Sequence, residues 1–258
     1  MLIRLRGNIP KQVGLGWKPG RGTNPQAFRS GAVLPKQGMI THGRKLWWAN
    51  GWWGDQGLQE YSKSECTIFG SLHAIHDGPI TPKKRPYARI IKPIRDPNKL
   101  YIRGQQIDGT DPADRESGLT CDAAAKVFRE EGLIGEWRWA ESVDEAVNWL
   151  LNVGPATIGK PWWWDDFELA PSGLLRMSGG YAGGHLTKMD GVDTINEVVW
   201  DKNSWSRQWG HARSLHPSGG AKRGFYGMTF KQLDNLLTNE GAEICMFREL
   251  PSMERLVA

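Results

Sequence analysis

Residues 183–210, GGHLTKMDGVDTINEVVWDKNSWSRQWG, carry the strongest structural signal in the chain. Two segments, HLTKMDGV and NEVVWDKNSW, meet at a turn near residues 193–196, and this pattern predicts a β-hairpin. His185 follows two glycines at the start of the first strand, and Asn203 follows the second strand. An amide that accepts a hydrogen bond from an imidazole N–H fixes the ring tautomer. The hairpin therefore predicts a His–Asn pair whose second ring nitrogen is left to act on another group.

The segment SECTIFGSLHAIH, residues 64–76, predicts a helix that begins close to Cys66, with Ser64 as its cap. Its apolar residues recur with the i, i+4, i+7 spacing of one helix face: Ile68, Leu72 and Ile75. At a helix start the unpaired N–H groups favour an anion, which lowers the pKa of a thiol. Cys66 is therefore a candidate nucleophile, and the alternative interpretation is a small buried apolar residue.

These motifs follow one another in an order that is known from a protein family. The order is Asp55-Gln56-Gly57, then Cys66-Thr67-Ile68-Phe69, then Gly183-Gly184-His185, and finally Asn203-Ser204-Trp205 with Trp209-Gly210. In this order the sequence resembles the papain family of cysteine peptidases, from about Gln56 to Gly210. The segment GPATIGKPWWWDDF, residues 154–167, is similar to the family's Gly-Pro strand. In its compact form the chain is most similar to the members encoded by bacteria and bacteriophages.

The resemblance implies an α+β, papain-like fold of two lobes, with the nucleophile on a helical lobe and the His and Asn on an antiparallel β lobe. It implies that Cys66 attacks a carbonyl as a thiolate beside a His185 imidazolium, and that Asn203 orients His185. The side chain of Gln56 and the backbone N–H of Cys66 would hold the oxyanion. Gln56 stands ten residues before Cys66, farther than is usual in the family, and Gln59 is the alternative.

Two further residues are expected to bind substrate by the same resemblance, Gly184 and Trp205. The Trp205 indole could also shield the His185–Asn203 hydrogen bond from water. No cofactor and no metal are expected. His73 and His76 lie three residues apart, but without a third ligand they are better explained as positive charges that stabilise the negative end of a helix dipole at its C-terminus.

Charge divides the chain into an arm, residues 1–45, and a body, residues 46–258. Nine Lys and Arg precede the first acidic residue, Asp55, which leaves 24 basic against 28 acidic residues in the rest of the chain. The arm is rich in Gly and Pro, so we expect an extended segment. It is interpreted either as a segment that docks on an acidic partner, on nucleic acid or on its own body, or as a solvated tail.

The body is predicted to place its helices first and most of its strands later, which favours an α+β domain. Residues 77–112 are expected to be irregular apart from a strand at 89–91, and residues 160–173 to form a loop. The other predicted helices lie at 120–131, from a Ser142 cap with Glu145 onward, and from Thr229 with Gln232 to Gly241; further strands are expected at 155–159 and 243–247.

Several classes of protein are disfavoured by composition. No apolar run approaches the roughly 18 residues of a membrane span, and the first residues lack the apolar region of a signal peptide. Three cysteines suit neither a disulfide framework nor a zinc site. We therefore expect a cytoplasmic or virion-associated protein. The many tryptophans are interpreted mainly as core residues and as cover for the arm.

Three functional hypotheses follow. The leading one is a peptidase acting on peptide or isopeptide bonds through Cys66, His185, Asn203 and Gln56. The second is a hydrolase of peptidoglycan stem peptides. The third is a bacteriophage structural or assembly protein that keeps the papain-like fold with weak or no activity. A peptide or protein substrate is the expected partner, self-assembly or virion assembly through the arm is the second expectation, and nucleic acid is not expected.

Overall fold

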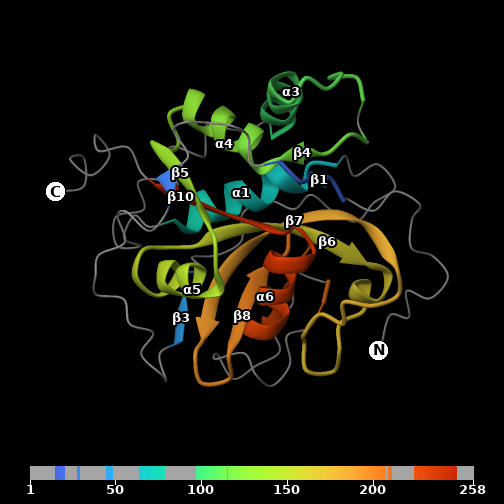
Figure 1. Ribbon diagram of the computed structural model, residues 1–258. Helices are drawn as coiled ribbons and strands as arrows, with labels where there is room; N and C mark the ends of the chain where they lie inside the picture. Colours follow the sequence, from blue (N-terminus) through green and yellow to red (C-terminus); the bar gives the residue numbers. More distant parts are fainter. Residues whose placement is uncertain are drawn as a thin grey trace.

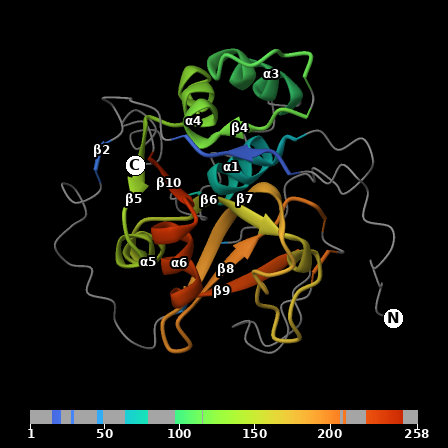
Figure 2. The same ribbon diagram turned by 45° about the vertical axis from the view of Figure 1, so that its right-hand side comes forward.

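The computed structural model describes residues 15–20, 28–29, 45–48, 64–78, 97–114, 116–206, 209–210 and 224–248. These residues form two lobes, one mainly helical and one built on an antiparallel sheet (Figures 1 and 2). The helices are α1 (Cys66–Asp77), α3 (Pro97–Ile107), α4 (Cys121–Glu130), α5 (Val143–Asn152) and α6 (Phe230–Asn239), and η2 (Trp164–Phe167) is a 3-10 helix.

The strands form one large sheet and one two-stranded sheet. The large sheet has the order β2-β5-β10-β6-β7-β8-β9, with β3 paired to β7, and all of its pairs are antiparallel except β2 with β5. The small sheet pairs β1 with β4 in parallel. The strands are β1 (Trp17–Lys18), β2 (Phe28–Arg29), β3 (Lys45–Trp47), β4 (Leu119–Thr120), β5 (Glu136–Ala140), β6 (Ala156–Trp163), β7 (Tyr181–Asp193), β8 (Val198–Lys202), β9 (Phe225–Thr229) and β10 (Glu243–Arg248).

Helix starts follow the predicted capping residues in the later part of the chain. Ser142 accepts from the Glu145 N–H at the start of α5, and Thr229 and Gln232 form a capping box at α6. The prediction for Ser64 was wrong: Glu65 is the N-cap of α1 and makes no side-chain capping bond, while Ser64 Oγ donates to the Glu116 carbonyl. The start of α1 is thus left without a side-chain cap.

Three segments differ from their predictions. Helix α3 lies in the stretch expected to be irregular, and its Pro97 occupies the first helical position, where a missing N–H costs nothing. Strand β6 continues through Trp163 into the expected loop because it pairs with β7 along this length. Strand β5 was not predicted, whereas the turn between β7 and β8 at 194–197 confirms the expected hairpin. The strand expected at 89–91 lies outside the described residues.

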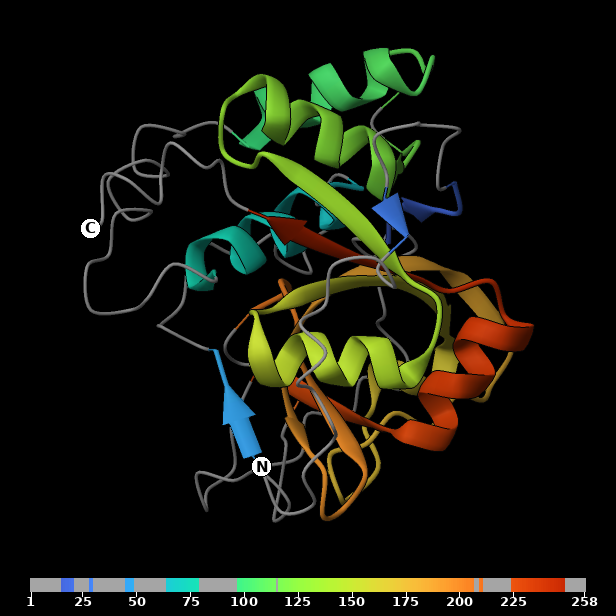
Figure 3. The ribbon, with the colours of Figure 1, turned by 60° about the vertical axis from the view of Figure 1, so that its left-hand side comes forward.

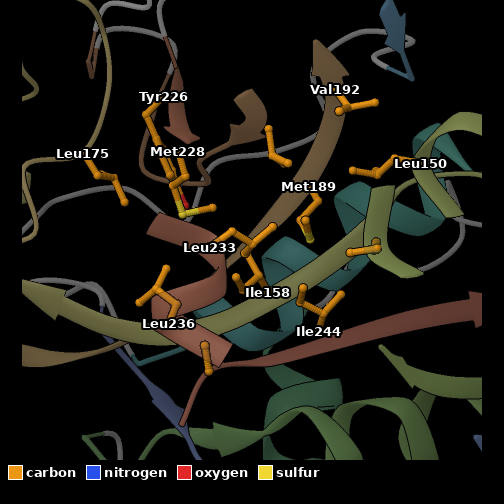
Figure 4. Packing of buried hydrophobic residues seen from close by; sticks show 14 of the residues in the cluster. Leu150, Ile158, Leu175, Met189, Val192, Tyr226, Met228, Leu233, Leu236 and Ile244 are labelled. Atoms are coloured by element: carbon orange, nitrogen blue, oxygen red, sulfur yellow. The ribbon is translucent and has the colours of Figure 1, made fainter. Parts of the chain in front are cut away.

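Two hydrophobic cores stabilise the lobes. One packs α5 and α6 against the large sheet and includes Ile158, Met189, Val192, Leu233 and Ile244 (Figure 4). The other joins α1, α3 and α4 to β5 and β10. Figure 3 shows α1 and the pair α5 and α6 on opposite sides of β6 and β7. Of the helices in the described ranges, none is long and apolar enough to cross a bilayer.

Helix α1 lies unusually close to β7. A Cβ atom built on Gly70 would stand 2.5 Å from Leu186 Cδ2 and 3.1 Å from the Leu186 carbonyl oxygen, so a larger residue here would push the helix away. Because Cys66 begins α1 and His185 precedes Leu186, this contact fixes how the two lobes present their candidate catalytic residues.

Candidate active site

The structure brings Cys66 next to the segment that carries His185. Cys66 is the first residue of α1, and its Sγ accepts a hydrogen bond from the Leu186 N–H at 3.4 Å. All three cysteines are free thiols and all are buried. Of these, Cys66 is the one whose sulfur accepts a hydrogen bond from the backbone of Leu186, the residue after His185.

His185 is held by Asn203 in the way the sequence predicts. His185 Nε2 lies 3.0 Å from Asn203 Oδ1, and Oδ1 also accepts from the Trp205 N–H at 3.3 Å. Because Nε2 donates to this oxygen, Nδ1 is the ring nitrogen that Asn203 leaves unengaged. Nδ1 is buried and has no hydrogen-bond partner among the residues that the structure describes.

Two tryptophans enclose the imidazole. The Trp205 ring stacks on His185 with centroids 4.5 Å apart and planes 22° apart, and Trp162 meets the His185 ring edge-on at 5.0 Å. Both indoles are fully buried. This position favours the shielding role of Trp205, since a low local dielectric strengthens a hydrogen bond. Its role in binding substrate stays a prediction. Trp162 was not singled out from the sequence, because its place depends on the pairing of β6 with β7.

The site is covered by residues 15–20, which we call the covering segment. The Leu119 N–H donates to the Gly16 carbonyl at 2.6 Å, and strand β1 of the segment pairs with β4. The segment is held further by Lys18 Nζ, which donates to Ser117 Oγ at 2.6 Å, and by the Gly20 N–H, which donates to Glu243 Oε1 at 2.9 Å. The Trp17 side chain is only 6% exposed.

Glycines make room for the backbone of this segment. A Cβ on Gly118 would stand 1.8 Å from the Gly16 oxygen, and a Cβ on Gly184 would stand 2.1 Å from the Trp17 oxygen. A Cβ on Gly159 would stand 2.0 Å from Nε1 of the Trp17 indole. The expected substrate-binding residue Gly184 therefore lies against a peptide, here one supplied by the same chain. The sequence did not reveal this, because nothing in the arm alone shows where it docks.

Burial controls the protonation of the candidate pair. Burial raises the pKa of the Cys66 thiol to about 11, although backbone hydrogen bonds of Leu186 and Gly16 and hydrogen bonds of Thr67 oppose the rise. Burial also lowers the pKa of His185 to about 3, Lys160 adds to the lowering, and the bond to Asn203 opposes it. At neutral pH the covered site therefore holds a thiol and a neutral imidazole. The helix start was expected to lower the thiol pKa, and the resemblance implied an ion pair of a Cys66 thiolate with a His185 imidazolium. In the covered site, burial outweighs both effects.

Gln56 and Gln59 lie outside the described residues. Within the described ranges, no group of three or more His, Cys, Asp and Glu could hold a metal ion. His73 is buried, and His76 Nδ1 lies 2.9 Å from Asp77 Oδ1. Asp77 belongs to a buried cluster of charges at the far end of α1.

Comparison with solved structures identifies the fold. The chain is similar to xylellain, a cysteine protease from Xylella fastidiosa, with a TM-score of 0.68 and 16% identity over 97% of this chain and 99% of that one. It is also similar to procathepsin B S9 from Trypanosoma congolense, with a TM-score of 0.59 and 12% identity over 92% of this chain and 87% of that one. No protein-family model and no curated protein sequence matches the chain.

The protein therefore has the two-lobed, papain-like cysteine-protease fold, as the sequence predicted. The division into an arm and a body at residue 45, and the bacteriophage or virion association, stay predictions.

Proposed function

We propose that the protein is a cysteine peptidase that hydrolyses peptide bonds through Cys66, His185 and Asn203. The observation that carries this proposal is the covering segment: a peptide backbone lies against the buried Cys66 and against Gly184, beside the His185–Asn203 pair. A site that seats a peptide next to a thiol and an oriented imidazole has both the ligand and the groups for amide hydrolysis.

The reaction uses the nitrogen that Asn203 leaves available. His185 Nδ1 takes the thiol proton while the Cys66 sulfur attacks the carbonyl carbon. The resulting imidazolium then gives its proton to the leaving amine, and a thioester forms. Water attacks the thioester with His185 as the base, which releases the acid and restores the thiol. Stabilisation of the oxyanion by Gln56 and the Cys66 N–H belongs to the same proposal.

The covering segment holds the enzyme in an inactive state in this proposal. Its Gly16 backbone contacts the Cys66 thiol, and burial is the largest cause of both the raised pKa of Cys66 and the lowered pKa of His185. Displacing the segment would let water reach both groups and would free the place where a substrate backbone binds.

Trp17→Ala is expected to speed alkylation of Cys66 by iodoacetamide at pH 7.5 at least about tenfold. The indole anchors the covering segment, and each unit by which the thiol pKa falls raises the thiolate fraction about tenfold. Mass spectrometry of digested protein measures the label on each of the three cysteines. Gly159→Ala should act in the same direction, because its new methyl group displaces the indole from the other side.

Trp164→Ala is the matched control, since that indole is 44% exposed. It should leave the Cys66 alkylation rate unchanged. Equal labelling of Cys66, Cys121 and Cys245 in the folded Trp17→Ala protein would contradict the proposed site.

Substrate class is tested by incubating the Trp17→Ala protein with a peptide library and identifying products by mass spectrometry. New peptide termini support the peptidase. Release of fragments from purified peptidoglycan without cleavage of library peptides would assign the same thiol chemistry to cell-wall stem peptides. Absence of both products with a reactive Cys66 would reject hydrolysis as the function.

A further inference from the structure

A lysine is buried directly beside His185, outside the triad. In the antiparallel pairing of β6 with β7, Lys160 stands opposite His185, so both side chains leave the same face of the sheet. Both side chains are fully buried. An ammonium group in such a place loses its hydration, which is unfavourable unless neighbouring groups compensate it. Its position next to the proposed base therefore calls for an explanation.

The lysine belongs to a compact polar cluster. Lys160 Nζ donates to Thr187 Oγ1 at 3.3 Å and to the Tyr226 hydroxyl, and it lies 3.9 Å from Asp201 Oδ2. Asp201 Oδ2 in turn accepts from the Tyr226 hydroxyl at 2.8 Å and from Thr187 Oγ1 at 2.9 Å. The Asp201 carboxylate thus accepts from two hydroxyl groups while it also faces the lysine, so its charge is shared among the three groups.

The cluster reaches His185 through an aromatic ring. Lys160 Nζ lies over the Trp162 ring, 5.2 Å from its centroid, and the same ring meets the His185 ring at 5.0 Å. Both groups are fully buried, so little water screens the positive charge from the imidazole.

We infer that the Lys160 ammonium is a buried positive charge beside His185, and that it lowers the pH at which the Cys66–His185 pair loses its protons. In this role Lys160 touches no substrate. It acts on His185 only through its charge, as a positioning residue. A like charge disfavours the imidazolium, whereas the same charge favours a thiolate on Cys66. The imidazolium proton is therefore lost at lower pH than it would be without the lysine, and the thiol proton is affected in the same direction only where the lysine is still charged.

The pKa shifts of the groups around the lysine agree with this effect on His185. Burial lowers the pKa of Lys160 to about 8, while Asp201, Asp166 of η2 and Cys66 oppose the lowering. Burial raises the pKa of Asp201 to about 6, against Lys160, Tyr226 and Thr187. Lys160 also contributes, after burial, to the lowered pKa of His185. The lysine is thus charged below about pH 8 and loses its effect above it.

The test is an NMR titration of the full chain with labelled histidine, from pH 3 to 9, in the wild type and in Lys160→Met. The His185 signal is identified by its loss in His185→Gln. We expect the midpoint of His185 to rise by about one unit or more in Lys160→Met. In Lys160→Met, Asp201 can take up a proton, so no buried charge is left without compensation. If the methionine prevents folding, Lys160→Gln is used in place of Lys160→Met.

Lys160→Arg is the matched variant, because it disturbs the cluster but keeps the charge. It should hold the midpoint near that of the wild type. If the midpoint is the same in Lys160→Met and the wild type, or if His185 stays neutral in both over the whole pH range in which they are folded, the inference is wrong.

The role of Lys160 in turnover rests on the proposed function, but the titration needs no turnover. A second measurement is the pH dependence of Cys66 alkylation in the Trp17→Ala background. Adding Lys160→Met should shift the acid limb to higher pH more than the alkaline limb, since the lysine has lost its charge in the alkaline range. A structural defect alone would lower the rate at all pH values without this asymmetry.

Discussion

Replacing Cys66 by alanine in the Trp17→Ala protein is expected to lower peptide hydrolysis at least about 10⁴-fold. Alanine retains the buried volume almost unchanged but removes the nucleophile, and His185 with Asn203 cannot form the acyl intermediate without it. The initial rate of cleavage of a library-derived peptide, with circular dichroism as the check on folding, measures the loss. The effect should appear in kcat, because the covalent step itself is lost.

Cys245→Ala in the same background is the control. Cys245 is equally buried, but it lies in β10 and its thiol has no part in the proposed chemistry. It should keep its hydrolysis rate within a few-fold of the parent protein. Residual activity of Cys66→Ala within tenfold of the parent would show that another residue or a contaminating enzyme performs the cleavage.

Asp77→Asn is expected to lower the free energy of unfolding by about 3–5 kcal/mol. Asp77 ends α1, and its Oδ2 lies 2.5 Å from Lys188 Nζ of β7 and 3.0 Å from Lys202 Nζ of β8. Lys188 also pairs with Asp190, so two carboxylates balance two ammonium groups, all with fully buried side chains. Asparagine removes the carboxylate that lies between the two buried lysines, Lys188 and Lys202. Urea denaturation followed by tryptophan fluorescence measures the change.

The stability of the protein at acid pH gives a second measure of the contribution of Asp77. Burial alone would raise the pKa of Asp77, but Lys188, a hydrogen bond from His76 and Lys202 hold it well below its usual range. A carboxyl group with a depressed folded-state pKa contributes stability above its unfolded pKa of about 4, and that contribution is lost as the pH falls below it. The wild type should therefore lose Tm more steeply below about pH 4 than Asp77→Asn does.

Glu130→Gln is the matched control for the buried cluster. Its ion pair with Arg103 is about half exposed on both sides, so the urea midpoint should stay close to that of the wild type. An Asp77→Asn protein that is as stable as Glu130→Gln would show that the buried charges contribute no net stability.

The sequence predicted best those features that depend on neighbouring residues. The helices α5 and α6 begin at their predicted capping side chains, because Ser142 and Thr229 bond to backbone N–H groups three residues away. The His185–Asn203 pair was equally accessible, because a single hairpin carries both residues and fixes their spacing.

The features that escaped prediction depend on contacts distant in the chain. The sequence places Lys160 in a predicted loop. Only the register of β6 on β7 shows that it lies opposite His185. The covering segment meets Cys66 and Gly184 across more than 40 and more than 160 residues of sequence, and no local pattern reports such a contact. The pKa of Cys66 depends on that burial, so the helix start alone gave the wrong direction.

The covering segment is tethered to the site that it occupies, and this changes the competition that any substrate meets. A ligand joined to its site by a flexible linker acts at an effective concentration in the millimolar range for short linkers. A peptide that binds the uncovered site with micromolar affinity would therefore compete poorly while the chain is intact. One cut between residue 20 and residue 28 would separate the covering segment from β2 and β3, which pair with the large sheet, and dilution alone would then favour release. The covalent continuity of the chain, together with the anchoring of the Trp17 indole in β1, would then set the threshold for activity.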